Sequence, residues 1–219
     1  MKRKQERFKL IEEYAHVIEP SKPSYLMMRG KWRPEFFRNE NPITLELACG
    51  RGEYTIGLSK IFPDKNFIGV DIKGERIWKG GTVALEEGLN NVGFLRTHIL
   101  LIENFFEPGE VSDIWLTFPD PRPRKRDIKR RLTSPRYLDI YKQLLKANGT
   151  VRLKTDNTQL FEYTLEQLQL RNDITDLVFT ADVYISDLKK ECFEIKTRYE
   201  QEFTKKGEKI KYLRFRFAL

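Results

Sequence analysis

The sequence contains few cysteines and no long apolar run, and each shortage excludes a class of protein. Two cysteines among 219 residues cannot form a disulfide framework, so we expect a chain that stays in a reducing compartment. No apolar segment approaches the ~20 residues that a membrane-spanning helix needs, and the charged N-terminus lacks the apolar core of a signal peptide. These shortages predict a cytoplasmic protein without a membrane partner.

Acidic residues are in deficit, with 32 Asp and Glu against 40 Lys and Arg, for a net charge of +8. The cations do not line an apolar helix face, so nucleic acid is a better-matched polyanion than a membrane surface. Solubility alone is the alternative explanation of the charge. At this length we expect a single α/β domain over residues 41–219, preceded by a basic extension over residues 1–40.

The extension interleaves one aromatic residue, Trp32, with Arg29, Lys31 and Arg33. An aromatic ring among cations suits stacking on a nucleic-acid base and contact with a phosphate. The same segment could instead be a flap that packs Trp32 against the domain. The sequence leaves both interpretations open.

From residue 41 the chain alternates between apolar strand patterns and amphipathic helices. This alternation predicts a Rossmann-like α/β fold with a seven-stranded, mostly parallel sheet, helices on both faces and an antiparallel C-terminal strand. Gly80 and Gly81, in the middle of a helix expected over 74–89, indicate close packing or a break in that helix. The expected strands are residues 43–48, 66–72, 91–97, 111–118, 149–157, 178–184 and 211–217.

The first two strands carry the pattern of a nucleotide-type site. Gly50 and Gly52 form a tight turn after the first strand, and Asp71 ends the second, where an acid can bind ribose hydroxyls. The third glycine of a nicotinamide-dinucleotide fingerprint is replaced by Thr55. Glu46, at the end of the first strand, would repel a diphosphate but could receive a cationic ligand. This combination indicates S-adenosylmethionine, which has a cationic aminoacyl part and no phosphate.

Residues 115–132 combine the end of the fourth strand with a proline turn and a basic run. Pro119 and Pro121 hold Asp120 on a stiff turn at the carboxyl end of that strand, where open α/β sheets bind ligands. A solvated basic loop is the alternative interpretation. The stiffness of the turn favours a functional role for Asp120.

Seven cations follow the turn within ten residues. We expect this run to contact phosphates without reading the base sequence, with Arg130 and Arg131 among the contacts. The seven are Arg122, Arg124, Lys125, Arg126, Lys129, Arg130 and Arg131.

Several of these features, in their order and spacing, resemble the tRNA (guanine-N7-)-methyltransferases of bacteria. The resemblance rests on GKW before the first strand, the E-x-A-x-G-x-G loop, the FPDPRP-x-KR and KRRL block, the LKTDN strand and the TRYE-x-x-F tail. It covers the chain from about residue 29 to the end. The FPDP block and the TRYE tail together are its most specific part.

The resemblance implies transfer of a methyl group from S-adenosylmethionine to N7 of guanine 46 in the tRNA variable loop, with S-adenosylhomocysteine as the second product. It also implies tRNA as the partner, no metal, and a monomer or homodimer. The implied catalytic residue is Asp120. The implied cofactor-binding residues are Glu46, Gly50, Asp71, His98 and Asp120. The implied substrate-binding residues are Arg124, Asp156, Thr197, Arg198, Tyr199 and Glu200.

The chain departs from the family pattern beside these residues. Arg122 stands where a Trp is usual, and His98 stands where an Asp typically contacts the adenine. A lone His is also a frequent capping residue, so His98 has two interpretations.

Other activities fit parts of the sequence less well. An amino-group methyltransferase would carry an aromatic residue two positions after Asp120, where this chain has Arg122. A nicotinamide oxidoreductase is disfavoured by Thr55 and Glu46. A non-catalytic RNA-binding protein that retains the fold would be expected to have lost Glu46, Asp71 and Asp120. Another RNA base methyltransferase of the same fold stays open.

Overall fold

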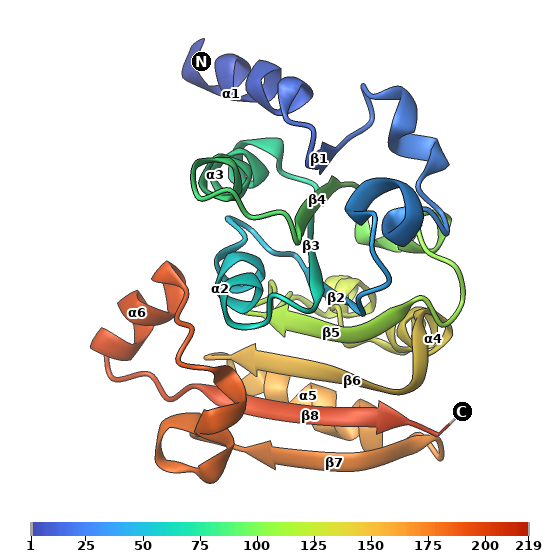
Figure 1. The fold of residues 1–219 in the computed structure, drawn as a ribbon. Helices are drawn as coiled ribbons and strands as arrows, with labels where there is room; N and C mark the ends of the chain where they lie inside the picture. The colour runs from blue at the N-terminus through green and yellow to red at the C-terminus, as the bar shows by residue number, and fades with distance from the viewer. Residues whose placement is uncertain (1, 219) are drawn as a thin grey trace.

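The computed structural model describes residues 2–218, apart from the side chains of residues 2–6 and of Phe8. These residues form an eight-stranded sheet in the order β1-β4-β3-β2-β5-β6-β8-β7 (Figure 1). All neighbouring pairs from β1 to β6 are parallel, and β8 is antiparallel to both β6 and β7. The strands are Val17–Ile18 (β1), Ile43–Leu47 (β2), Asn66–Asp71 (β3), Val92–Arg96 (β4), Val111–Thr117 (β5), Leu145–Thr155 (β6), Ile174–Thr180 (β7) and Lys211–Phe217 (β8).

The predicted fold class is therefore confirmed, with one strand more than expected because Val17–Ile18 pairs with β4. Helices cover both faces of the sheet (Figure 1). They are Lys2–Glu13 (α1), Glu53–Ile61 (α2), Gly74–Glu86 (α3), Pro135–Leu144 (α4), Thr158–Gln169 (α5) and Arg198–Lys205 (α6).

The two faces of the sheet have separate cores because successive strand side chains point to opposite sides. Leu45 of β2 packs in the cluster that includes Leu138 of α4 and Phe161 of α5. On the other face, Phe94 packs with Ile77 of α3, and Trp115 packs with residues of α2. Because β2 is buried along its whole length, its sequence is mostly apolar, and its buried carboxylate, Glu46, has hydrogen-bond partners inside the protein.

The glycine pair in α3 allows close packing, and the helix continues unbroken through it. A Cβ atom at Gly80 would lie 2.6 Å from the carbonyl oxygen of Arg51 and 2.7 Å from the ring of Phe94. A side chain there would push α3 away from the turn that follows β2. The interpretation of these glycines as close-packing residues is therefore correct, and a break in the helix is wrong.

The N-terminal segment packs Trp32 into the protein. The indole is fully buried, its Nε1 donates to the carbonyl oxygen of Phe105 over 2.7 Å, and its ring stacks on Phe106 with centroids 5.4 Å apart. Base stacking by Trp32 is therefore wrong, and packing against the domain is correct. A boundary near residue 40 stays a prediction.

The seventh strand predicted at 178–184 lies earlier, at Ile174–Thr180. Asp182 ends the extended backbone because its carboxylate accepts from the backbone N–H of Tyr184 over 3.2 Å and caps a helical turn at Val183–Ile185. A second such turn follows at Asp187–Cys192. The apolar residues of 183–185 thus belong to a segment that folds back over the sheet.

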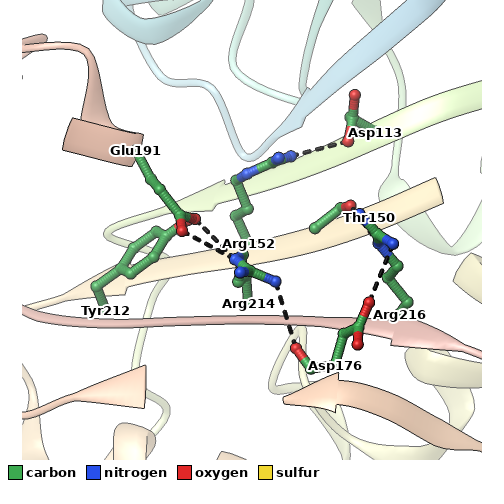
Figure 2. Close-up of polar contacts among 8 residues, drawn as sticks. All are labelled: Asp113, Thr150, Arg152, Asp176, Glu191, Tyr212, Arg214 and Arg216. Atoms are coloured by element: carbon green, nitrogen blue, oxygen red, sulfur yellow. Dashed lines mark hydrogen bonds and ion pairs between the residues drawn. The ribbon is translucent and has the colours of Figure 1, made fainter. Parts of the chain in front are cut away.

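The face of the sheet that carries Trp115 is charged toward one end of β6 (Figure 2). Each arginine there has a carboxylate partner, so we expect no phosphate binding at this end. The ion pairs are Arg152–Asp113 at 2.8 Å, Arg214–Glu191 at 2.9 Å and Arg216–Asp176 at 3.0 Å.

Candidate active site

The turn between β2 and α2 is built from residues with left-handed backbone. Ala48, Gly50 and Gly52 have φ values of 59°, 57° and 69°. A Cβ atom at Gly52 would lie 2.5 Å from the ring of Phe94, so only glycine fits there. Gly52 is also the N-cap of α2, so the backbone N–H groups of the first helical turn, which have no partner within the helix, lie at this loop.

Glu46 is buried beneath the turn and ties three elements together. One carboxylate oxygen accepts from the N–H and the hydroxyl of Thr55, over 2.8 and 2.6 Å, and the other accepts from the hydroxyl of Thr117 over 2.6 Å. Burial raises the pKa of Glu46 to about 7, although the hydrogen bonds from Thr117 and Thr55 oppose this rise. A contact of Glu46 with a cationic ligand stays a prediction, because both oxygens already have partners in the protein.

Asp71 lies beside the glycine turn, as the spacing indicated. Its carboxylate accepts from the N–H of Gly50 over 3.0 Å and from the N–H of Lys73 over 2.8 Å. The acid at the end of β3 thus holds the turn that follows β2. Its contact with a ribose stays a prediction.

A cavity of about 380 Å³ opens at the carboxyl ends of β2 and β5. Its wall combines the glycine turn, the end of β5, one residue of α3 and the first turn of α6. Of the predicted site residues, Gly50, Thr197, Arg198 and Tyr199 line it. The remaining lining residues are Ala48, Cys49, Arg51, Glu53, Arg76, Thr117, Phe118 and Glu202.

Several of these lining residues were missed in the sequence. Arg51 and Glu53 flank Gly52, and Phe118 directly precedes the proline turn, so their neighbours in sequence could have indicated them. Arg76 has no such signal because it reaches the cavity from α3, a helix that packs beside the turn only in the folded chain.

The turn that carries Asp120 is held from inside the protein. Asp120 accepts from the N–H of Arg122 over 3.1 Å and pairs with its guanidinium over 3.3 Å, and 59% of the Asp120 side chain stays exposed. Arg131 donates to the carbonyl oxygens of Pro121 and Arg122, over 3.0 and 3.3 Å. Asp120 does not itself line the cavity, but Phe118, two residues earlier, does.

The prediction that Arg131 contacts phosphate is wrong. Its side chain is buried, and its guanidinium lies 4.5 Å from the ring centroid of Tyr163. Arg130 is different, since its side chain is 70% exposed and pairs with Asp127 over 3.2 Å. The basic run therefore contains one arginine that holds the turn among others that face solvent.

The beginning of α6 meets the end of β6 at the cavity. Thr197 caps the helix by accepting from the N–H of Glu200 over 3.0 Å. The hydroxyl of Tyr199 donates to Asp156 over 3.3 Å, and the Tyr199 ring lies 5.4 Å from that of Phe118. Burial, with the neighbouring Asp156 carboxylate, raises the pKa of Tyr199 to about 12. Asp156 and Tyr199, far apart in sequence, are thus brought together.

Three predicted residues lie elsewhere. His98 is exposed and caps a helical turn, its Nδ1 accepting from the N–H of Leu100 over 3.3 Å, which matches the second of its two interpretations. Arg124 is exposed in the basic run. Glu200 is fully buried in an ion pair with Lys154. Contacts of these residues with cofactor or substrate stay predictions.

The described part of the chain has neither a metal-binding cluster nor a membrane-spanning helix. Residues 2–218 contain no group of three or more His, Cys, Asp and Glu side chains that could hold a metal ion. None of the helices described is long and apolar enough to cross a membrane.

An open, mostly parallel sheet with a glycine turn after β2 and an acid at the end of β3 defines a Rossmann-like α/β fold. Solved structures share it: a 16S rRNA methyltransferase has a TM-score of 0.61 at 11% identity, covering 88% of this chain and 92% of that chain. An antibiotic-related methyltransferase has a TM-score of 0.58 at 15% identity, covering 83% and 89%. A family model described as putative methyltransferase matches residues 40–213.

Relatives at higher identity narrow the class. The tRNA (guanine-N(7)-)-methyltransferase of Cytophaga hutchinsonii is 49% identical over 96% of each chain. That of Bacteroides thetaiotaomicron is 48% identical, covering 98% of this chain and 86% of its own length. That of Listeria monocytogenes is 38% identical over 86% of each. The chain belongs to the tRNA (guanine-N(7)-)-methyltransferase family.

Proposed function

We propose that this enzyme transfers the methyl group of S-adenosylmethionine to N7 of guanine in tRNA, at position 46 of the variable loop. The observation that carries the proposal is the cavity at which the glycine turn, the end of β5 and the first turn of α6 meet. A donor bound at the turn and a base bound at α6 would share this one space. The location that follows from a tRNA substrate is the cytoplasm.

The charges of the cavity fit the aminoacyl end of S-adenosylmethionine. Glu53 offers a carboxylate for its ammonium group, and Arg51 and Arg76 offer guanidinium groups for its carboxylate. Asp71 and the exposed side chain of Ile72, at the end of β3, are suited to the ribose and the adenine. When bound, the cofactor supplies an electrophilic methyl group on a sulfonium.

Guanine N7 needs no general base, because it has a free lone pair at neutral pH. The protein must hold the base in line with the donor and exclude water. The ring becomes cationic as the methyl arrives, so a fixed carboxylate nearby stabilises the transition state more than the ground state. Asp120 and Asp156 follow β5 and β6 and are candidates for this role, since Asp120 is two residues after Phe118, Asp156 accepts from Tyr199, and both Phe118 and Tyr199 line the cavity.

Aromatic rings and surface cations suit a loop nucleotide. Phe118 and Tyr199 present rings at the cavity on which an unstacked guanine can pack. The exposed cations after the turn are placed to contact the tRNA backbone, which provides affinity without reading sequence. They are Arg124, Lys125, Arg126, Lys129 and Arg130.

The test uses the purified chain, labelled S-adenosylmethionine and an unmodified tRNA transcript, followed by nucleoside analysis of the product. We expect 7-methylguanosine, and none in a transcript whose guanine 46 is replaced by adenine. A different methylated nucleoside would favour another RNA base methyltransferase. Formation of 7-methylguanosine in the substituted transcript would contradict position 46 as the target, while the guanine N7 methylation reaction itself would stand.

A further inference from the structure

Helix α6 attaches to the protein in an unusual way. A surface helix normally docks through an apolar stripe. Within Arg198–Lys205 the one buried residue is a carboxylate, Glu200. The helix that lines the cavity with Arg198, Tyr199 and Glu202 is therefore held by a polar anchor.

Lys154 of β6 is the partner of that anchor. Its Nζ lies 2.6 Å from Oε1 of Glu200, and both side chains are at most 1% exposed. The hydroxyl of Tyr184 donates to the same carboxylate oxygen. Removing two charges from water is costly, so an apolar pair would hold α6 on the protein at a lower cost in free energy. What an ion pair adds is a defined position.

Lys154 also reaches the elements on either side of the cavity. Its Nζ donates to the hydroxyl of Tyr54 over 3.0 Å and to the carbonyl oxygen of Ile195 over 3.3 Å. Tyr54 lies in the first turn of α2, directly after Glu53, and Ile195 lies two residues before Thr197. One ammonium group thus joins the first turn of α2, the segment before α6 and α6 itself.

Packing around this anchor is incomplete. A second cavity of about 260 Å³ is lined by Lys154, Tyr184 and Cys192, among others. Lys154 is therefore not closely packed on that side. At the surface, α6 is linked to its neighbours by hydrogen bonds from the N–H of Arg198 to Glu53 and from Tyr199 to Asp156, and by the contact of the Tyr199 ring with Phe118.

We propose that Lys154 is a positioning residue for methyl transfer, holding α6 against the first turn of α2 through Glu200 and Tyr54. This inference rests on the proposed function, in which α6 binds the guanine. With Lys154 in place, Thr197 and Tyr199 stand at a fixed distance from the donor. Without it, α6 shifts or frays, and a displacement of about 1 Å can lower a rate by about 100-fold.

The chain supplies a matched control on the same strand. Arg152 lies two residues before Lys154, on the same face of β6, and pairs with Asp113 over 2.8 Å (Figure 2). Its other neighbour is the ring of Trp115, not α6. Arg152→Met therefore removes a cation from an ion pair without touching the anchor.

The experiment compares wild type, Lys154→Met and Arg152→Met by three measurements. These are hydrogen–deuterium exchange of residues 197–205, calorimetric affinity for S-adenosylmethionine, and single-turnover methylation at saturating tRNA. For Lys154→Met we expect faster exchange in α6, a rate lower by about 10- to 100-fold and cofactor affinity within about threefold. For Arg152→Met we expect wild-type exchange in α6 and a wild-type rate.

A double variant, Lys154→Met with Glu200→Met, separates positioning from stability. Replacing both members of a buried pair by apolar residues is often neutral for folding, whereas removing one is not. We expect the double variant to recover its melting temperature while α6 still exchanges faster and the rate stays low. Should Lys154→Met fail to fold, this variant carries the test by the same measurements.

Three results would overturn the proposal. They are an unchanged α6 exchange in both variants that lack Lys154, a normal rate in the double variant, or a parallel loss of cofactor affinity and rate in Lys154→Met. If wild type itself fails to methylate tRNA, the proposed function falls, and the exchange of α6 still decides whether Lys154 positions it.

Discussion

Nε of Arg131 donates to the carbonyl oxygen of Pro121 over 3.0 Å, so a buried arginine holds the turn that carries Asp120. The prolines restrict the backbone of this turn, but Arg131 sets where it lies relative to the domain. The basic run beside it thus contains groups with different roles, and substitution can separate them.

Arg131→Ala should destabilise the fold and slow methylation. The change removes two hydrogen bonds from a charged donor and its contact with Tyr163. We expect a loss of about 2–4 kcal/mol in the free energy of unfolding. Chemical denaturation measures this loss. A variant of wild-type stability with weakened tRNA binding would contradict the structural role of Arg131.

Arg130→Ala is the matched surface change, since this side chain faces solvent and pairs with Asp127 over 3.2 Å. An exposed pair contributes ~0–1 kcal/mol, so stability should stay near wild type. The affinity for tRNA should fall, and the slope of its logarithm against that of salt concentration should flatten by about one. Binding titrations at several salt concentrations check this, and an unchanged slope would exclude a phosphate contact.

Asp120→Asn should keep cofactor and tRNA binding and lose most of the turnover. The amide can still accept from the N–H of Arg122, which the carboxylate does now over 3.1 Å. The substitution removes the negative charge that would face the guanine as it becomes cationic. Loss of one preorganised electrostatic partner lowers a rate by about 100- to 1000-fold. Single-turnover methylation is the measurement. A near-normal rate would transfer the electrostatic role to Asp156.

Glu46→Gln should change how stability depends on pH. The pKa of Glu46 is raised to about 7 in the folded protein against 4.5 for an ordinary Glu, chiefly by burial. The folded state therefore binds this proton more tightly, and stability is lost as pH rises from about 4.5 through about 7. Relative to the variant, wild type should lose about 3 kcal/mol of unfolding free energy across that window.

Denaturation of both proteins at a series of pH values gives the difference. Thr55→Ser is a suitable control because it retains the hydroxyl and the N–H that bind Glu46. Parallel pH profiles for wild type and Glu46→Gln would show that folding does not raise the pKa of Glu46.

Local sequence determined most of the strands and helices after residue 41 and the two turns that carry the site. The glycines at 50 and 52 are required by backbone conformation and by the Phe94 ring, so their pattern is visible without a structure. The acids that end β3 and β6 stand at the carboxyl edge because parallel strands all point their ends to that side. Motifs of this kind can be predicted from sequence because they depend on residues that are close together in the chain.

The roles of buried charges were decided only by tertiary structure. Arg130 and Arg131 are adjacent and chemically alike, yet one faces solvent and the other is buried under the proline turn. Glu200 reads in sequence as part of a polar cluster, and it becomes an internal anchor because Lys154 comes from a strand far away in the chain. A charged side chain enters a protein interior only where distant segments supply its partners, and those partners are brought together by folding rather than by spacing.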